Sequence, residues 1–360
     1  MKKLLSVAVL AALGAVSQAQ ASITVGINPD GSAGPVVNVG SLAWNVGNAL
    51  SVAAPTESIT PTPGSSGVGG HAGQVFTTYA MSSLAAFNNG SGTGIFTNLN
   101  NTFEWTYVVG FQETFTAFGA TAGAGTNAFT INAGTSRTSS NFVEFWADTS
   151  KDSNALTGTG YRNGTLVLSG YFADLGNYAA GTAGSGAFTA TETAAGSGVP
   201  IIQNLDQFGS NNYVGTRSVI GDGNTQADIR VDYYNPAYFV TAPTVMSINL
   251  TSQQKLAFKQ TDPAACFWTG SGYMNGAGGV DCAGVGNTAS TIGSINGISG
   301  PNVMLQTLAT SNFDGSALQG KQIRLMANGQ EVYNSCAAIP SGSVGPGITG
   351  YQFVYSGNGY

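Results

Sequence analysis

Short segments in which apolar and polar residues alternate recur along the chain from residue 75 onward, between turns rich in Gly and Asn. The clearest segment spans residues 103–115. One face of this segment would carry Phe103, Trp105, Tyr107, Val109 and Phe111, whereas Glu104, Thr106 and Gln112 lie off it. A period of two is typical of a strand with one buried face and one face toward solvent. The pattern therefore predicts a half-buried antiparallel strand.

Similar segments at residues 141–147, 164–170, 245–250 and 256–258 are also predicted to be strands. Residues 217–234 predict a hairpin, because a Gly-Asp-Gly-Asn turn at 221–224 separates two alternating runs and an Asp-Gly pair supplies the positive φ of a tight turn. Only residues 84–87 and 316–326 are short helix candidates. Many strands without intervening helices predict an all-β, predominantly antiparallel fold, a β-sandwich or jelly-roll-like one with few short helices.

The first 21 residues have the pattern of a secretory signal. Lys2 and Lys3 precede an apolar run at 4–16, and Ala19 and Ala21 are the small residues that a signal peptidase needs. The run is shorter than the ~20 residues of a membrane-spanning helix. We therefore predict a cleaved signal peptide at 1–21, a main β domain at 22–262 and a Gly-rich, cysteine-bearing C-terminal segment at 263–360 that packs on the main domain.

Charged residues make up only 8% of the chain, against about 25% in an ordinary globular domain. Without the two leader lysines, 9 basic residues face 17 acidic ones. This composition disfavours nucleic acid as a partner, because no basic patch could neutralise phosphates. It is more typical of secreted β-rich surface, adhesin and matrix proteins than of intracellular enzymes.

Three cysteines, Cys266, Cys282 and Cys336, lie late in the chain. In an oxidising compartment two of them should pair, and Cys266 with Cys282 is the local choice. Closing that loop would add about 3 kcal/mol if the geometry permits it. Cys336 is then either buried and inert or a link between chains. A zinc site is disfavoured because no Cys-x-x-Cys motif occurs and the single histidine, His71, lies far away in sequence.

Several motifs occur in an order that resembles the flocculation-associated PEP-CTERM surface proteins of Gram-negative, floc-forming bacteria. The matching motifs are Asn28-Pro29-Asp30-Gly31, Gly47-Asn48-Ala49-Leu50, Thr102-Phe103-Glu104-Trp105-Thr106, Leu156-Thr157-Gly158, Asn163-Gly164-Thr165-Leu166, Leu205-Asp206-Gln207-Phe208-Gly209, Tyr234-Asn235-Pro236-Ala237-Tyr238-Phe239, residues 285–301 and Met304-Leu305-Gln306-Thr307. The resemblance implies an exported protein that helps cells aggregate within an exopolysaccharide matrix, and it supplies no catalytic residues.

Members of that family should end in Val-Pro-Glu-Pro, a hydrophobic helix and an Arg cluster. Residues 314–360 contain none of these three parts. We therefore expect free secretion, or retention at the surface by another route, in place of sorting by that tail.

Candidate catalytic chemistry is sparse. His71 lies among glycines, where a solvated loop residue is the simpler interpretation, and no nucleophile elbow occurs at any serine. Glu104 and Glu144 each lie beside a tryptophan in a predicted strand, so opposed strands could pair them as in a glycosidase, although solvent-facing carboxylates explain them more simply. No catalytic residue is therefore assigned.

No metal or cofactor site is assigned either. Asp148, Asp152 and Asn154 are the best candidate ligands for calcium, but three oxygens fall short of the six to eight that this ion takes.

Aromatic residues could stack on sugar rings if several stood on an exposed face. Most should instead be core, since aromatics dominate the interiors of β-sandwiches. The residues considered are Trp105, Trp146, Trp268, Tyr161, Tyr171 and Tyr273. Among them Trp268 and Tyr273, inside the Cys266–Cys282 loop, are the best candidates for contact with carbohydrate.

Together these features predict a non-enzymatic, exported cell-surface or matrix protein that promotes floc or biofilm formation. Its partners would be exopolysaccharide or other matrix components, with self-association and without nucleic acid or a transmembrane anchor. The alternative is a carbohydrate-binding adhesin that uses exposed aromatics, with or without calcium. A third hypothesis, an extracellular glycoside-active enzyme, requires a cleft with two close carboxylates.

Overall fold

The computed structural model describes residues 24–52, 73–121, 124–190, 202–204, 208–210, 217–219, 221–252, 260–275, 323–327, 330–335 and 350–359, which form strands, turns and loops. The strands are β1 (Val25–Ile27), β2 (Val37–Val39), β3 (Ser41–Trp44), β4 (Gly47–Val52), β5 (Val75–Asn88), β6 (Gly94–Ile95), β7 (Glu104–Thr121), β8 (Ala124–Asn132), β9 (Phe142–Asp148), β10 (Thr165–Phe172), β11 (Thr182–Ala190), β12 (Ile202–Asn204), β13 (Arg217–Val219), β14 (Gly221–Tyr234), β15 (Val245–Ser252), β16 (Cys266–Trp268), β17 (Tyr273–Asn275), β18 (Ile323–Ala327), β19 (Gln330–Ser335) and β20 (Gly350–Gly359).

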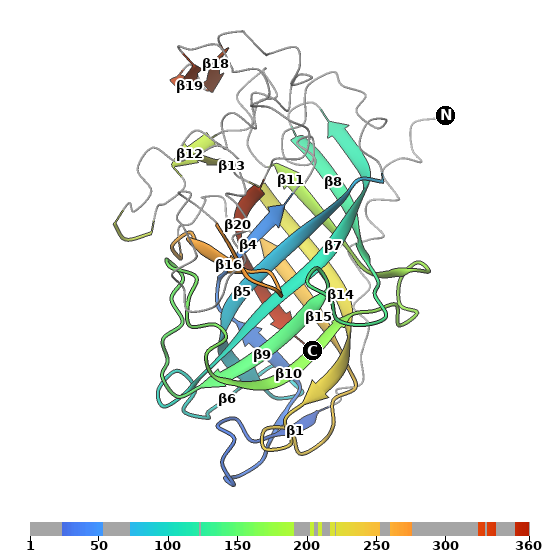
Figure 1. The fold of residues 1–360 in the computed structure, drawn as a ribbon, viewed down its shortest axis with the longest axis vertical. Coiled ribbons are helices and arrows are strands. Elements are labelled where there is room, and N and C mark those ends of the chain that lie inside the picture. Colours follow the sequence, from blue (N-terminus) through green and yellow to red (C-terminus); the bar gives the residue numbers. More distant parts are fainter. Residues whose placement is uncertain are drawn as a thin grey trace.

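Most of these strands belong to one antiparallel sheet that closes on itself. Successive hydrogen-bonded neighbours run β7, β8, β11, β14, β15, β20, β4 and β5, and β5 pairs again with β7. Three shorter strands lie end to end with members of this ring: β9 follows β8 along the same edge of β7, β10 follows β11 along β14, and β3 follows β4 along β20. Each of these strands is therefore paired along both edges, and Figure 1 shows them running obliquely around a common interior.

The long strand β7 illustrates why this sequence closes. Residues 104–110 pair with β9 and residues 113–121 pair with β8 along one edge, while β5 pairs along the other. Because side chains alternate, Trp105, Tyr107, Val109 and Phe111 all face inward and are buried. The inward face predicted for residues 103–115 is confirmed. The prediction of a half-buried strand is wrong, because Glu104, Thr106 and Val108 on the other face are buried as well.

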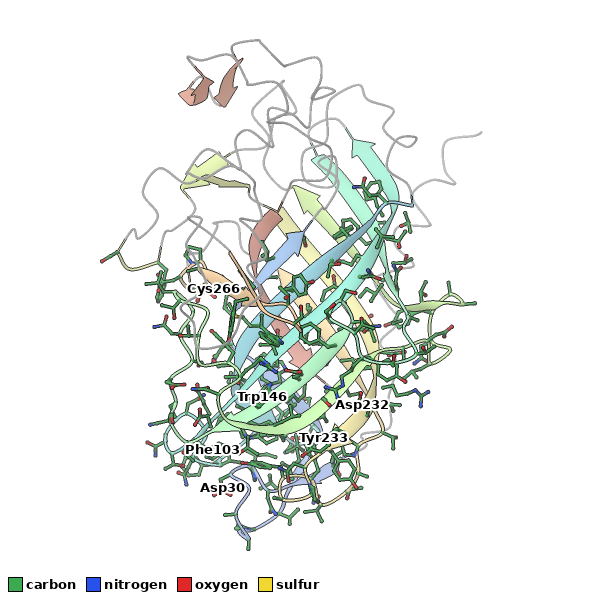
Figure 2. All side chains as sticks on the ribbon, in the orientation of Figure 1. Asp30, Phe103, Trp146, Asp232, Tyr233 and Cys266 are labelled. Carbon is green, nitrogen blue, oxygen red and sulfur yellow. The ribbon has the colours of Figure 1, made fainter. Side chains whose placement is uncertain are left out.

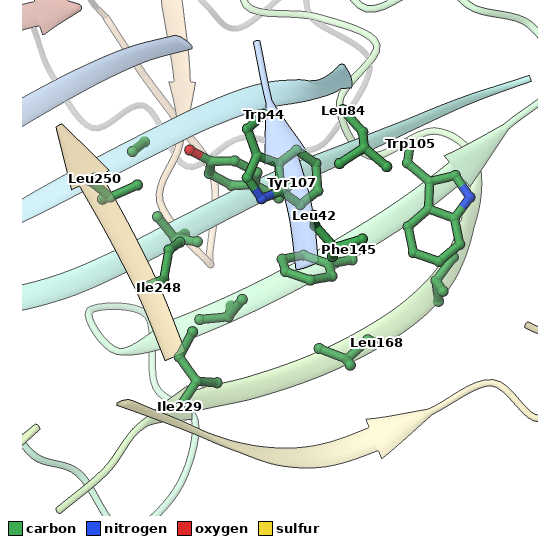
Figure 3. Packing of buried hydrophobic residues seen from close by; sticks show 14 of the residues in the cluster. Leu42, Trp44, Leu84, Trp105, Tyr107, Phe145, Leu168, Ile229, Ile248 and Leu250 are labelled. Carbon is green, nitrogen blue, oxygen red and sulfur yellow. The ribbon is translucent and has the colours of Figure 1, made fainter. Parts of the chain in front are cut away.

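Aromatic side chains from several strands fill the interior. Trp44 of β3 meets Tyr107 edge-on, with ring centroids 4.5 Å apart, and lies 5.1 Å from Phe145 of β9. Aliphatic residues of the opposite wall, including Ile248 of β15, complete the same cluster (Figure 3). The packing is that of a β-sandwich whose two layers are continuous at their edges. The all-β, predominantly antiparallel prediction is confirmed.

Three local predictions are wrong. Residues 323–326 of the helix expected at 316–326 belong to β18 and pair with β19, and the rest of that helix lies outside the described residues. Residues 84–87 were expected as a short helix but belong to β5, because β3 and β6 supply backbone partners for this stretch. Residues 221–224 were expected as a hairpin turn but are the first residues of β14, paired with β11 on one edge. From Gly223 onward, β15 pairs with the other edge. Glycine allows an extended conformation as readily as a turn, so pairing with two neighbours decided the outcome.

The expected C-terminal segment 263–360 contributes β20 to this same sheet, between β15 and β4. The expected main domain 22–262 and the C-terminal segment therefore share one sheet. The expected leader 1–21, His71, Cys282 and Cys336 lie outside the described residues. In the described part of the chain, no helix has the length and hydropathy needed to cross a bilayer.

Candidate functional site

The outer face of β4, β5, β7 and β9 carries a second layer formed by two loops, residues 153–163 and 260–275. Beneath these loops lies a second apolar cluster, separate from the interior of the sheet: Leu50, Tyr79, Met81, Val108, Phe142, Tyr161, Ala264 and Phe267. The layer explains why even-numbered residues of β7, such as Thr106 and Val108, are buried as well as odd-numbered ones.

A polar cavity of about 320 Å³ opens at the edge of this layer. Three separate parts of the chain line it, namely the β3–β4 turn with β5, the loop 153–161, and residues 260–261. The lining residues are Asn45, Val46, Ser83, Ser153, Ala155, Tyr161, Gln260 and Thr261. Six of the eight carry hydroxyl or amide groups, and none carries a charge.

The β3–β4 turn is fixed over β5 by three hydrogen bonds. The backbone N–H of Asn45 donates to the carbonyl oxygen of Ser83 over 2.9 Å, and the Asn45 side-chain Nδ2 donates to Ser83 Oγ over 3.0 Å. Ser82 Oγ donates to the carbonyl oxygen of Asn45 over 2.7 Å. This wall of the cavity is therefore held in place without a ligand.

The opposite wall rests on a buried carboxylate. Ser153 donates to Glu104 twice, from its backbone N–H over 2.9 Å and from its Oγ over 2.6 Å. Thr106 Oγ1 donates to the carbonyl oxygen of Tyr161 over 2.9 Å. Burial, together with the negative charge of Glu104, raises the pKa of the Tyr161 phenol well above its usual range. This phenol is therefore a neutral hydrogen-bonding group at any physiological pH.

Glu104 and Glu144 lie on neighbouring strands but not side by side. Glu104 is paired with Asp148, whereas Glu144 is paired with Val108, four residues farther along β7. At about 3.4 Å per residue the two backbone positions are about 14 Å apart along the strands, beyond the about 5–10 Å between the carboxyl groups of a glycosidase pair. This register keeps the two carboxylates from acting as a pair. The simpler expectation that both face solvent is also wrong, because both are buried.

Glu144 instead belongs to a stacked cluster on the outer face. Its Oε2 accepts a hydrogen bond from Arg162 Nε over 2.7 Å. The guanidinium of Arg162 lies 3.8 Å from the ring centroid of Trp268 and 4.9 Å from that of Trp146. The cluster joins the loops to β9 by ionic, hydrogen-bonding and cation–π contacts.

Another ion pair lies on the same sheet. Figure 2 labels Trp146 and, to its right, Asp232, whose carboxylate accepts a hydrogen bond of 2.7 Å from Arg137 Nε.

The two residues predicted to contact carbohydrate do lie together. Trp268 and Tyr273 are paired across β16 and β17, with ring centroids 5.4 Å apart. Tyr273 is only 8% exposed, and Arg162 covers one face of the half-buried Trp268. Of the other aromatics considered, Trp105 and Tyr161 are buried, while Trp146 and Tyr171 are half-buried. The rings on this face thus serve largely to pack the loops.

The candidate calcium ligands do not converge. Asp148 accepts from the backbone N–H of Ser150, and both carboxylate oxygens of Asp152 accept from Asn163. Asn154 Oδ1 caps its own turn by accepting from two backbone N–H groups. Among the described residues, no group of three or more His, Cys, Asp or Glu side chains is placed to hold a metal ion.

One carboxylic acid faces the interior of the sheet. Glu113 of β7 is 5% exposed and is paired with Phe76 on β5 and Ile131 on β8. Thr78 donates to its carboxylate over 2.5 Å, and Ser51 contacts Thr78 Oγ1 over 2.6 Å. Burial raises the pKa of Glu113 to about 7, with the bond from Thr78 acting in the opposite direction.

Cys266 is buried at the start of β16. Because Cys282 lies outside the described residues, the Cys266–Cys282 pair stays a prediction.

Sequence reasoning missed the residues of the polar cavity. Asn45, Ser83, Ser153 and Thr261 are ordinary turn and strand residues, and they meet only because separate loops fold onto one face. Comparison with known proteins found no matching family model, no matching curated protein and no matching solved structure. The family resemblance therefore stays a prediction.

Proposed function

We propose that this protein is an exported, non-catalytic component of the cell surface or extracellular matrix that promotes cell aggregation. Its partner would be exopolysaccharide or another matrix component. The proposal rests on the charge-poor composition, on the order of motifs described above and on the secretory pattern of residues 1–21.

The closed sheet with its outer layer is consistent with the proposal. A sheet paired along both edges offers little backbone for strand addition, so attachment to a matrix must use side chains on its surface. The loops at 153–163 and 260–275 provide such a surface, and they are fixed by Glu104, Glu144 and Arg162. These carboxylates thus act as structural ties in this arrangement.

Removing the gene and scoring floc or biofilm formation tests the proposal, with purified protein added back in a second arm. Loss of aggregation that the added protein restores is the expected result. Normal aggregation in the deletion strain would contradict it. Heat-unfolded protein at the same concentration is the control for nonspecific bridging.

The adhesin alternative is favoured by one specific observation, the uncharged polar cavity. Trp268 and Tyr273 offer less for this purpose, because Arg162 and the neighbouring loop cover much of their surface.

A further inference from the structure

We infer that the polar cavity between the β3–β4 turn and the loop 153–161 is a binding site for one neutral, hydroxyl-rich ring, the size of a single sugar residue. The inference rests on the proposed function, because a sugar is the unit of the matrix partner proposed there. At about 320 Å³ the cavity lies at the lower end of ligand pockets, which span about 300–1,000 Å³. It therefore suits a single ring better than a long segment.

The chemistry of the lining selects the class of ligand. The hydroxyl groups of Tyr161 and Thr261 can donate and accept a hydrogen bond. Ser83 Oγ accepts from Asn45 and can still donate, whereas Ser153 Oγ donates to Glu104 and can still accept. The side-chain oxygen of Asn45 is a further acceptor. Sugar hydroxyls both donate and accept, so a ring with several hydroxyls can satisfy many of these groups at once. An apolar ligand would leave them unpaired, which carries a large desolvation cost.

Charge excludes other small ligands. The carboxylate of Glu104 lies behind Ser153 and already accepts two hydrogen bonds from it. An anion would approach that carboxylate with no cationic side chain in the lining, and a cation would find no free carboxylate there. The Tyr161 phenol stays neutral because burial raises its pKa. A neutral ligand therefore loses the least hydration free energy when it enters this cavity.

The walls are also held in position before any ligand arrives. The turn at Asn45 is hydrogen-bonded to β5, and the loop at Ser153 is hydrogen-bonded to Glu104. Next to the third wall, at residues 260–261, Asn48 Nδ2 donates over 3.1 Å to the carbonyl oxygen of Asp262. Binding would thus cost little ordering of the protein, which favours measurable affinity from a small ligand.

The test uses the full chain and the methyl glycosides of glucose, galactose, mannose and N-acetylglucosamine, with saturation-transfer NMR and titration calorimetry as readouts. At least one glycoside should bind in the millimolar range. Ala155→Phe fills the cavity and should weaken that binding at least about tenfold, and Asn45→Ala should weaken it about fivefold through one lost hydrogen bond. Ala180→Phe, the same change at an exposed residue of the β10–β11 connection, should leave it unchanged.

Unchanged melting midpoints show that each variant folds, and Asn45→Ala, at an exposed turn residue, keeps the test decisive if Ala155→Phe unfolds. Three results would overturn the inference: no glycoside binds, Asn45→Ala and the folded Ala155→Phe bind as the wild type does, or an N-acetylated amino-acid amide binds where glycosides do not. If Ala155→Phe loses glycoside binding but still supports aggregation, the sugar site is supported and aggregation does not depend on it. Conversely, glycoside binding by a protein that fails to restore flocs would refute the proposed function alone.

Discussion

The clearest energetic prediction concerns Glu113 inside the closed sheet. Its pKa is raised from an ordinary 4.5 to about 7 by burial. As pH rises through about 4.5, the unfolded chain releases this proton while the folded protein keeps it. The free energy of unfolding should therefore fall between about pH 4.5 and pH 7 and then level off. The folded and unfolded pKa values differ by about 2.5, which at about 1.4 kcal/mol per pKa unit corresponds to about 3.5 kcal/mol of stability.

The Glu113→Gln variant tests this reasoning, because its side chain is neutral in both states at every pH. Urea unfolding at a series of pH values from about 4 to about 8 should give similar stability for both proteins at the acid end. At the alkaline end the variant should be more stable than the wild type by up to about 3.5 kcal/mol. No charged residue occupies the cross-strand positions beside Glu113, which are Phe76 and Ile131, so the difference between the two curves reports on this group.

A matched control is available at Asp174, an exposed residue whose pKa is lowered by hydrogen bonds from the backbone N–H groups of Gly181 and Gly176. Its contribution has the opposite sign, since it is lost as pH falls, so Asp174→Asn should not reproduce the gain at high pH. A constant difference between wild type and Glu113→Gln across the whole pH range would refute the argument.

Three further predictions concern packing and cross-links. Gly110→Ala would place a Cβ 2.4 Å from a ring carbon of Phe142, so urea unfolding should show a loss of about 1–3 kcal/mol, and an unchanged midpoint would contradict this packing. Ser153→Ala removes one of the two hydrogen bonds to the buried carboxylate beneath its loop and should cost about 1.5–3 kcal/mol in the same assay, whereas wild-type stability would argue against the tie. Peptide mapping without reductant should recover Cys266 joined to Cys282, and a different partner for either would overturn that pairing.

Alternation along β7 was enough to predict which side chains face the interior, because a strand with one buried face has a strict period of two. It did not predict that Thr106 and Val108 on the other face would also be buried. Their burial depends on loops at 153–163 and 260–275, whose docking is a long-range event without a local signature. The wrong turn at 221–224 has the same origin, since pairing with β11 and β15 outweighed the local preference of Gly-Asp-Gly.

The candidate site was less accessible from the sequence than the fold. By its sequence neighbours Glu104 is a candidate acid, but the structure places it under Ser153, where it accepts a hydrogen bond and holds the loop. Trp268 drew attention as a stacking platform, and Arg162 covers one of its faces. The cavity residues carry no distinctive chemistry one by one. They form a cavity only because separate loops fold onto the same face, and this docking depends on tertiary contacts.

The pairing of β20 with β4 joins segments that lie far apart in the sequence. In this pair Val354 lies opposite Asn48, about 300 residues earlier in the chain, so closure requires one of the longest loop closures available to this chain. Until β20 arrives, β15 and β4 present edges with unpaired backbone groups, the kind of surface on which chains aggregate. The interval before closure is therefore the period of greatest risk, and a chaperone that shields those two edges would protect this protein most effectively.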